Sequence, residues 1–274
     1  MQMTEKPVNW GSNPCNPTLK SINIMVATRT ISILSGKGGV GKTTMTFNLG
    51  TALTDFGRNT LIIDGNLTTP NLGLHAGIPL YPISLHDVLK GKVDIYDVMH
   101  ILPSGLKIVP ASINLNDLKG VNPELLSSNL IELVGKLDFI LIDGAPGLGR
   151  EATSVLSASN EAIGISTMDL PSITDLLKSI KVVEQYKKNY IGSIINMVRY
   201  KKYETKREHV SSLLEETPIL ELVPHDESVR YALSNRLPVI HHKPNSRASH
   251  KIKNIAAKLI GKEYKAPWYR RWFG

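Results

Sequence analysis

A glycine-rich segment near the N-terminus carries two lysines and a threonine in an arrangement suited to binding phosphates. The segment Gly36-Lys37-Gly38-Gly39-Val40-Gly41-Lys42-Thr43 fits the pattern G-x-x-x-x-G-K-[ST]. Its glycines allow backbone N–H groups to turn inward around an anion, and a helix that follows adds the positive end of its dipole. We expect Lys42 to reach the β- and γ-phosphates of a nucleotide and the Thr43 hydroxyl to ligate Mg²⁺, with Thr44 completing the predicted contacts.

The elements around this segment are those that a phosphate-binding loop requires. Apolar residues between Met45 and Phe56 recur at helical spacing, and Gly57 is placed to end that helix. Short apolar, β-branched runs that alternate with helical patterns predict a doubly wound α/β fold, a mostly parallel sheet with helices on both faces. The runs are Thr30–Leu34, Thr60–Ile63, Leu106–Val109, Asp138–Ile142, Ala162–Ser166, Ile191–Val198 and Ile219–Val223.

Composition narrows the class of protein and its compartment. The chain has 274 residues and one cysteine, Cys15, which excludes a disulfide framework and a zinc or iron–sulfur site built from several cysteines. No apolar run approaches the roughly 18 residues of a spanning helix, and the N-terminus lacks the apolar core of a signal peptide. The sequence therefore predicts a cytoplasmic protein.

The position of Lys37 within the loop carries a resemblance to a known family. The pattern K-G-G-x-G-K-T resembles the deviant Walker A loop of the MinD/ParA family of P-loop ATPases. The resemblance implies that Lys37 crosses a homodimer interface to the partner's phosphates, in the manner of an arginine finger. It also implies ATP and Mg²⁺ as cofactors, and hydrolysis that depends on dimerisation.

Further motifs follow in the family's order. The segment "LDFILIDGAPGLG" resembles Walker B and switch II, which implies that Asp143 holds the Mg²⁺ shell through water and that residues 144–149 sense the γ-phosphate. Asn196 matches the asparagine that reads the adenine edge, and Pro224 and Asp226 match residues that flank the base. The segment "IDGNLTTPNLGLHAG" resembles switch I and is closest in style to archaeal MinD-like proteins.

Switch I departs from the family at one position. The family places two aspartates at D-x-D, and the second orients or activates the attacking water. Here Asp64 is present, but Asn66 stands at the second position. An asparagine can position water but cannot accept a proton, so we expect both residues to act in catalysis with a rate reduced by about 10–10³.

The charge of the chain is concentrated at its C-terminus, where aromatic residues also gather. Nine basic residues and one acidic residue fall between His241 and Gly274, so this stretch carries the whole net charge of +8. A helix at the end would separate aromatic from arginine side chains, which suits an anionic bilayer surface. Family members often end in such a membrane-targeting helix. The expected membrane tip is Trp268, Tyr269, Arg270, Arg271, Trp272 and Phe273; a partner-binding hook and packing against the body are alternatives.

We divide the chain into three parts on this basis. Residues 1–28 form a flexible leader, of which 1–24 are expected to be dispensable, residues 29–262 form the ATPase domain, and residues 263–274 form the amphipathic tip. The resemblance predicts a MinD-like regulator of cell division or polar positioning, which dimerises on ATP, lies on the cytoplasmic face of the membrane and positions an unidentified protein partner.

Two alternatives stay open. A ParA-like protein would use nonspecific DNA as its matrix, and a basic cluster diluted by Glu204 and Glu208 could serve that role. That cluster comprises Arg199, Lys201, Lys202, Lys206 and Arg207. The third reading is an ATP-bound scaffold that hydrolyses slowly because of Asn66.

Overall fold

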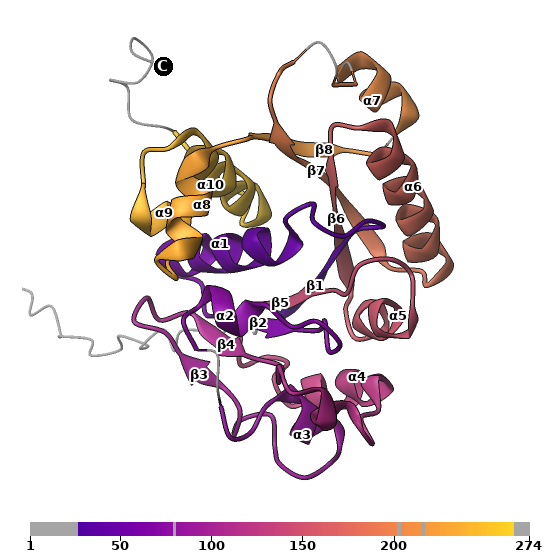
Figure 1. The fold of residues 1–274 in the computed structure, drawn as a ribbon, viewed down its shortest axis with the longest axis vertical. Helices are drawn as coiled ribbons and strands as arrows, with labels where there is room; N and C mark the ends of the chain where they lie inside the picture. Colours follow the sequence, from indigo (N-terminus) through magenta and orange to yellow (C-terminus); the bar gives the residue numbers. More distant parts are fainter. Residues whose placement is uncertain (1–26, 79–80, 202–203, 206, 215–216, 266–274) are drawn as a thin grey trace, which may run out of the picture.

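The computed structural model describes residues 27–265 except for 79–80, 202–203, 206 and 215–216 (Figure 1). The leader through residue 26 and the predicted tip, Trp268 to Phe273, lie outside the described residues, as do Lys202 and Lys206. Thr28, which the sequence placed in the leader, is buried, and its hydroxyl donates to the Leu137 carbonyl at 2.7 Å.

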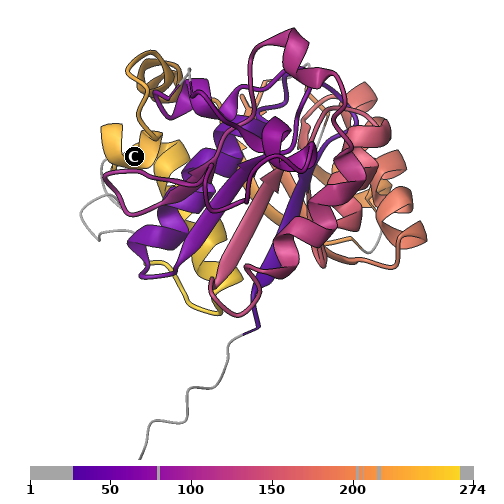
Figure 2. The same cartoon turned by 90° about the horizontal axis from the view of Figure 1, so that it is seen from below.

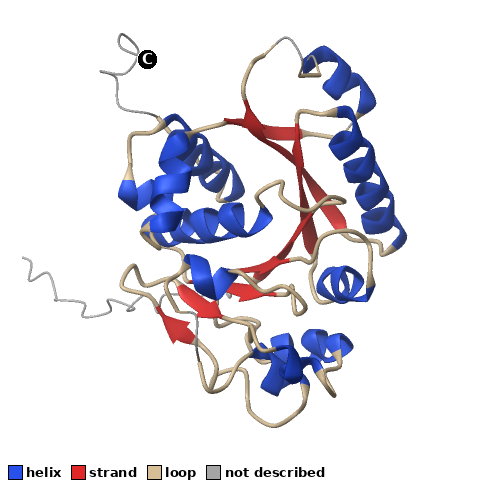
Figure 3. Ribbon diagram, viewed as in Figure 1, coloured by secondary structure: helices blue, strands red, loops and turns tan. Residues whose placement is uncertain are grey.

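An eight-stranded sheet forms the centre of the molecule, in the order β3-β4-β2-β5-β1-β6-β7-β8 (Figure 3). The strands are β1 Arg29–Leu34, β2 Thr60–Asp64, β3 His100–Ile101, β4 Lys107–Val109, β5 Phe139–Asp143, β6 Glu161–Thr167, β7 Asn189–Val198 and β8 Ile219–Pro224. Neighbours pair in parallel except β3 and β4, which are antiparallel. The predicted doubly wound fold is confirmed, and each predicted run is a strand.

Helices cover both faces of this sheet. In Figure 1, α1 and α8–α10 lie on one side, and α5–α7 lie on the other; Figure 2 shows the same layers from below. The helices are α1 Lys42–Asp55, α2 Leu72–His75, α3 Leu85–Leu89, α4 Leu126–Ile131, α5 Arg150–Ser157, α6 Leu170–Gln185, α7 Arg207–Leu213, α8 Glu227–Ser234, α9 Val239–His242 and α10 Arg247–Leu259. Short 3₁₀ turns span Leu115–Leu118 and Pro123–Leu125.

The central strands are apolar throughout because both of their faces are buried. Along β5, Phe139 and Leu141 pack into the core beside α1 and α10, whereas Ile140 and Ile142 pack into the core beside α3 and α4. Alternate residues of a strand point to opposite faces, so a continuous apolar run serves two cores at once. The same arrangement aligns the carboxyl ends of β2, β5 and β1 at one edge.

The helix that follows the glycine-rich loop ends where the sequence predicted. Gly57 adopts a left-handed conformation with φ of 78°. Its N–H donates to the Thr54 carbonyl, and the next N–H, of Arg58, donates to the Leu53 carbonyl. These bonds form a Schellman motif, which satisfies the last carbonyls of α1 and returns the chain toward β2.

Candidate functional site

The glycine-rich loop joins β1 to α1 at the carboxyl edge of the sheet. Gly39 and Gly41 have positive φ angles of 79° and 94°, and Gly41 is the N-cap of α1 without a side-chain hydrogen bond. The first N–H groups of the helix therefore have no side-chain cap and are suited to an anion. A side chain at Gly36 would collide with the backbone of Asp175 on α6, so the loop requires glycine there to pack against that helix.

Lys42 lies beneath the loop, held by a residue that the sequence reading missed. Its Nζ donates to the Ser35 hydroxyl at 2.8 Å, and Ser35 in turn donates to the Lys37 carbonyl at 2.7 Å. Burial lowers the pKa of Lys42, and the Asp143 carboxylate opposes that shift. A buried ammonium of this kind gains from a bound anion. Ser35 could have been suspected from its place between the strand and the motif.

Thr43 and Asp143 meet directly, as expected for two residues that share a metal. The Thr43 hydroxyl donates to Asp143 Oδ2 at 2.5 Å, and the Thr46 hydroxyl reaches Asp143 Oδ1 at 3.5 Å. Asp143 ends β5, and Thr43 is the second residue of α1, so the carboxyl end of the sheet brings them together. The pairing of a hydroxyl with a carboxylate fits the small ligand set that Mg²⁺ takes from proteins.

A second buried carboxylate makes this edge strongly acidic. Asp64 is the register partner of Asp143 across β2 and β5, and both side chains are almost fully buried. Burial raises the pKa of Asp64 well above its usual range, and the Asp143 charge adds to the rise. Burial also raises the pKa of Asp143 to about 6, although the Thr43 bond and Lys42 act against it. A cation bound beside Asp143 would favour its charged form, as the Lys42 ammonium does.

The protein supplies only part of the coordination that such a cation needs. In the described part of the chain, no group of three or more His, Cys, Asp and Glu side chains could hold a metal ion. Mg²⁺ keeps several waters and often takes the rest of its ligands from substrate phosphates. Thr43 and Asp143 therefore fit Mg²⁺ that arrives with a nucleotide.

Asp64 and Asn66 are occupied within their own loop. Asp64 accepts from the backbone N–H groups of Asn66, Asn71 and Leu72, at 3.3, 3.0 and 2.9 Å. The Asn66 amide donates to the carbonyl and hydroxyl of Thr69 and accepts from Thr69, so it closes a turn of four residues. Both side chains thus shape the loop between β2 and α2, and their predicted catalytic role stays a prediction.

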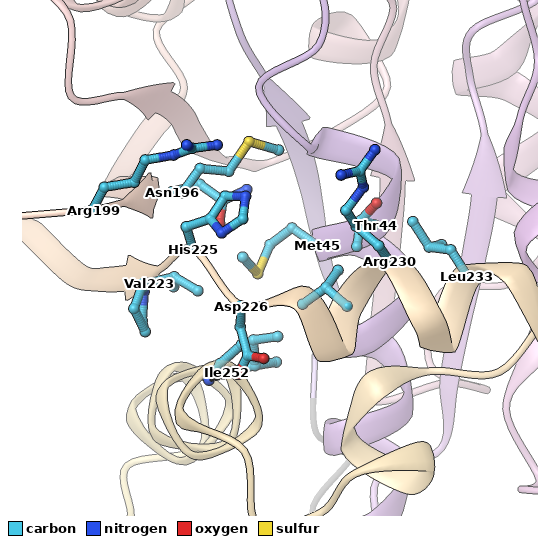
Figure 4. A pocket seen from close by; sticks show the side chains of 14 residues that line it. Thr44, Met45, Asn196, Arg199, Val223, His225, Asp226, Arg230, Leu233 and Ile252 are labelled. Atoms are coloured by element: carbon cyan, nitrogen blue, oxygen red, sulfur yellow. Dashed lines mark hydrogen bonds between the residues drawn. The ribbon is translucent and has the colours of Figure 1, made fainter. Parts of the chain in front are cut away.

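A cavity of about 370 Å³ opens beside the start of α1 (Figure 4). It is bounded by the ends of β7 and β8 and by α8 and α10. Thr44, Asn196, Pro224 and Asp226, all predicted nucleotide contacts, line it. In Figure 4 Arg199 and Arg230 lie on either side of His225, from the loop after β7 and from α8. The walls are mainly apolar, as is typical of a cavity that takes a nucleobase.

Asn196 and Asp226 differ in whether their side-chain oxygens are available to a ligand. The Asn196 amide donates to the Val40 carbonyl at 2.8 Å, which ties β7 to the glycine-rich loop and leaves its oxygen as an acceptor. Asp226 accepts from the N–H of Ser228 at 2.9 Å and from that of Ala248 at 3.3 Å. Asp226 therefore joins the first turns of α8 and α10, and its direct contact with a base stays a prediction.

Lys37 has a counterion in its own chain. Its Nζ lies 3.6 Å from Asp169 Oδ1, and the side chains of both residues are about half exposed. Asp169 is the N-cap of α6 and accepts from the Ser172 N–H at 3.0 Å. The side chain is thus near the surface beside the loop, a position compatible with the predicted reach to a second subunit.

His75 is another residue at the site that the motifs did not reveal, and it contacts Thr44. Its Nδ1–H donates to the Asn71 carbonyl at 2.7 Å, which leaves Nε2 of the neutral ring to accept from the Thr44 hydroxyl at 3.3 Å. The imidazole therefore connects α2 with the first turn of α1.

Comparisons with known proteins agree with this geometry. Residues 31–239 match the sequence model of a family described as the CobQ/CobB/MinD/ParA nucleotide binding domain. An uncharacterised ATP-binding protein of Methanocaldococcus jannaschii is 35% identical over 236 residues, covering 86% of this chain and 89% of that protein. The septum site-determining protein MinD of Pyrococcus horikoshii, solved with Mg-ADP, has 33% identity and a TM-score of 0.81, covering 85% of this chain and 96% of its own. The MinC:MinD cell division protein complex of Aquifex aeolicus has 26% identity and a TM-score of 0.76, and the match covers 87% of this chain and 98% of the matched chain.

Proposed function

This chain belongs to the CobQ/CobB/MinD/ParA family, and from that premise we propose that it is a MinD-like ATPase whose ATP-bound dimer binds a membrane reversibly and positions a protein partner. The observation that carries the proposal is the meeting of Lys42, Thr43 and Asp143 beside a cavity of about 370 Å³. This arrangement suits the phosphates and the base of one nucleotide, and the ligands are ATP and Mg²⁺.

Each residue at the loop has a defined task in this proposal. The uncapped N–H groups of α1 and the ammonium of Lys42 bind the β- and γ-phosphates. Thr43 and Asp143 would hold Mg²⁺, whose charge would offset the negative charge that develops on the phosphate oxygens during phosphoryl transfer. Asn196, through its free amide oxygen, accepts from the adenine amino group.

Lys37 makes turnover depend on a second copy of the chain. Its exposed ammonium leaves Asp169 and enters the partner's site, where it faces the phosphates of the second ATP. Asn66 cannot take a proton from water, and its amide is bonded to Thr69, so turnover is slow. The ion pair between Lys37 and Asp169 of the same chain is a surface contact worth about 1 kcal/mol or less, so a phosphate can displace Asp169.

Membrane binding rests on the C-terminal tip and on dimerisation. The described residues contain no helix that is long and apolar enough to span a bilayer. A short aromatic and basic tip binds a surface weakly, at about 10⁴ M⁻¹, and two tips on one dimer gain about 10²–10⁴ in avidity. ATP therefore favours the bound state on the cytoplasmic face, and hydrolysis releases the protein.

Sedimentation with anionic liposomes in ATP and in ADP tests this function. We compare the full chain, a chain that ends at Ala266, and a control chain that begins at Met25. ATP-dependent pelleting should be lost only when the tip is removed. Pelleting in neither nucleotide, together with ATP-dependent and salt-sensitive binding to nonspecific duplex DNA, would replace the membrane with DNA. Dimerisation without phosphate release would favour the scaffold.

A further inference from the structure

Glu151 binds the loop that follows β2 through three donors. Its Oε2 accepts from the N–H groups of Leu67 at 3.0 Å and Thr68 at 3.4 Å, and its Oε1 accepts from the Thr68 hydroxyl. We call this set of contacts the Glu151 clasp. A carboxylate is acceptor-only, so it satisfies all three donors at once, and hydrogen bonds to a charged acceptor are the strong kind.

The clasp joins the two loops that begin at the buried aspartates. Glu151 lies in the first turn of α5, which comes directly after the segment 144–149 that follows Asp143. Leu67 and Thr68 lie in the segment 65–71, which starts at Asp64. At the start of the first segment, the Gly65 N–H donates to the carbonyl of Asp143, the residue before the second segment, at 2.9 Å. The contact residues are 84 and 83 positions apart in the sequence.

Leu67 is fixed from its other side as well. The His86 ring on α3 donates from Nε2 to the Leu67 carbonyl at 3.2 Å and accepts at Nδ1 from the Ser112 N–H at 3.0 Å. Thr69, one residue after the clasp, holds the Asn66 amide. The clasp thus pins the turn that sets the position of Asn66 relative to Asp64.

The hydrogen bonds of the clasp do not cap the helix that carries Glu151. The N-cap of α5 is Gly149, which makes no side-chain hydrogen bond, and the Glu151 oxygens are directed to the other loop rather than to the N-terminus of α5. The neighbouring Arg150 makes an ordinary surface ion pair with Glu124 at 3.2 Å. That pair provides a matched comparison on the same turn.

We propose that Glu151 is a positioning residue that makes the segments 65–71 and 144–149 respond to the γ-phosphate as one unit. The inference rests on the proposed ATPase function. When 144–149 moves, α5 and the Glu151 carboxylate move with it. The clasp transmits that displacement to Thr68 and to the turn that holds Asn66. Without the clasp, a displacement of 144–149 no longer reaches 65–71, and the attacking water loses its fixed position.

Hydrogen exchange measured by mass spectrometry tests the coupling directly, without reliance on turnover. In the wild type, adding Mg²⁺ with a slowly hydrolysed ATP analogue should change protection in both segments. In Glu151→Gln the change should persist in 144–149 and be lost in 65–71. Glu124→Gln should behave as wild type. Equal responses of both segments in Glu151→Gln and wild type would overturn the inference.

Kinetics separate the clasp from a merely structural role. We expect Glu151→Gln to lower kcat about tenfold or more, with the Kd for ADP within about twofold, because displaced reacting groups cost rate rather than ground-state binding. Thr68→Val should lower kcat similarly, and the double variant should be no worse than either. Additive losses would contradict the clasp. A wild type without turnover but with coupled exchange would overturn only the hydrolytic part of the proposed function.

Discussion

Asp64 and Asp143 lie opposite each other at the ends of neighbouring parallel strands, yet their carboxylates have different tasks. Asp64 accepts from three backbone N–H groups of its own loop, and two of these belong to the start of α2. Asp143 accepts from the hydroxyls of Thr43 and Thr46, on the helix that follows the glycine-rich loop. Asp64 therefore shapes the loop after β2, and Asp143 is the acid that we propose binds the metal.

Replacing Asp143 tests the metal assignment. In the wild type, Mg²⁺ added to saturating ADP should raise the free energy of unfolding further, because the ion binds only the folded site. In Asp143→Asn the additional increment from Mg²⁺ should disappear while ADP alone still stabilises. Thermal unfolding with ADP, with and without Mg²⁺, measures both increments. An undiminished Mg²⁺ increment in the variant would contradict the assignment.

Lys37→Ala should separate nucleotide binding from turnover. The side chain is half exposed and its ion pair with Asp169 is a surface contact, so stability should change by less than about 1 kcal/mol. The Kd for ADP should stay within about twofold, whereas kcat should fall by about 10³ or more if the lysine acts as an arginine finger does. Titration calorimetry and phosphate release measure the two. A parallel loss of ADP affinity would place Lys37 in its own subunit's site.

Asn66→Asp should raise turnover by about 10–10³, because a carboxylate restores a proton acceptor at this position. The aspartate can still accept from Thr69, but it loses the donor that meets the Thr69 carbonyl at 2.7 Å. Stability should therefore fall by about 1–3 kcal/mol. Single-turnover phosphate release and chemical denaturation test the pair of effects. Unchanged turnover would show that Asn66 does not limit the rate.

His86 should make stability depend on pH. The Ser112 N–H donates to Nδ1 and Nε2–H donates to Leu67, so the buried ring is neutral, and burial lowers its pKa from 6.5. The unfolded chain binds a proton near pH 6.5 and the folded chain does not, so stability is lost as pH falls below 6.5. The wild type should therefore lose its advantage in unfolding free energy over His86→Gln as the pH is lowered. Chemical denaturation of both proteins between about pH 7.5 and about pH 5 measures this difference. A constant difference would contradict the neutral assignment.

Elements with strong local signals were predictable from the sequence, and contacts between distant side chains were not. All seven predicted strands formed because their apolar runs serve two cores, as Phe139 and Ile140 illustrate. Strand β3, His100–Ile101, has two residues and no periodicity to detect. The glycine-rich loop and Asp143 were identified with the partners their motif requires. No sequence motif predicts the Glu151 clasp, because its residues come from different elements and meet only where the tertiary fold places α5 beside the loop after β2.

Helix α10 forms part of the cavity wall and leads directly into the C-terminal segment. Ala248 and Ile252 line the cavity, and the helix continues to Leu259, a total of 13 residues or about 20 Å. Because the helix is rigid, the cavity and the point where the tail departs are held at a fixed spacing. Tails could therefore be exchanged after this helix in chimeric proteins. If the tail is the membrane anchor that we propose, such chimeras would keep the nucleotide affinity of the body and take their surface binding from the donor tail.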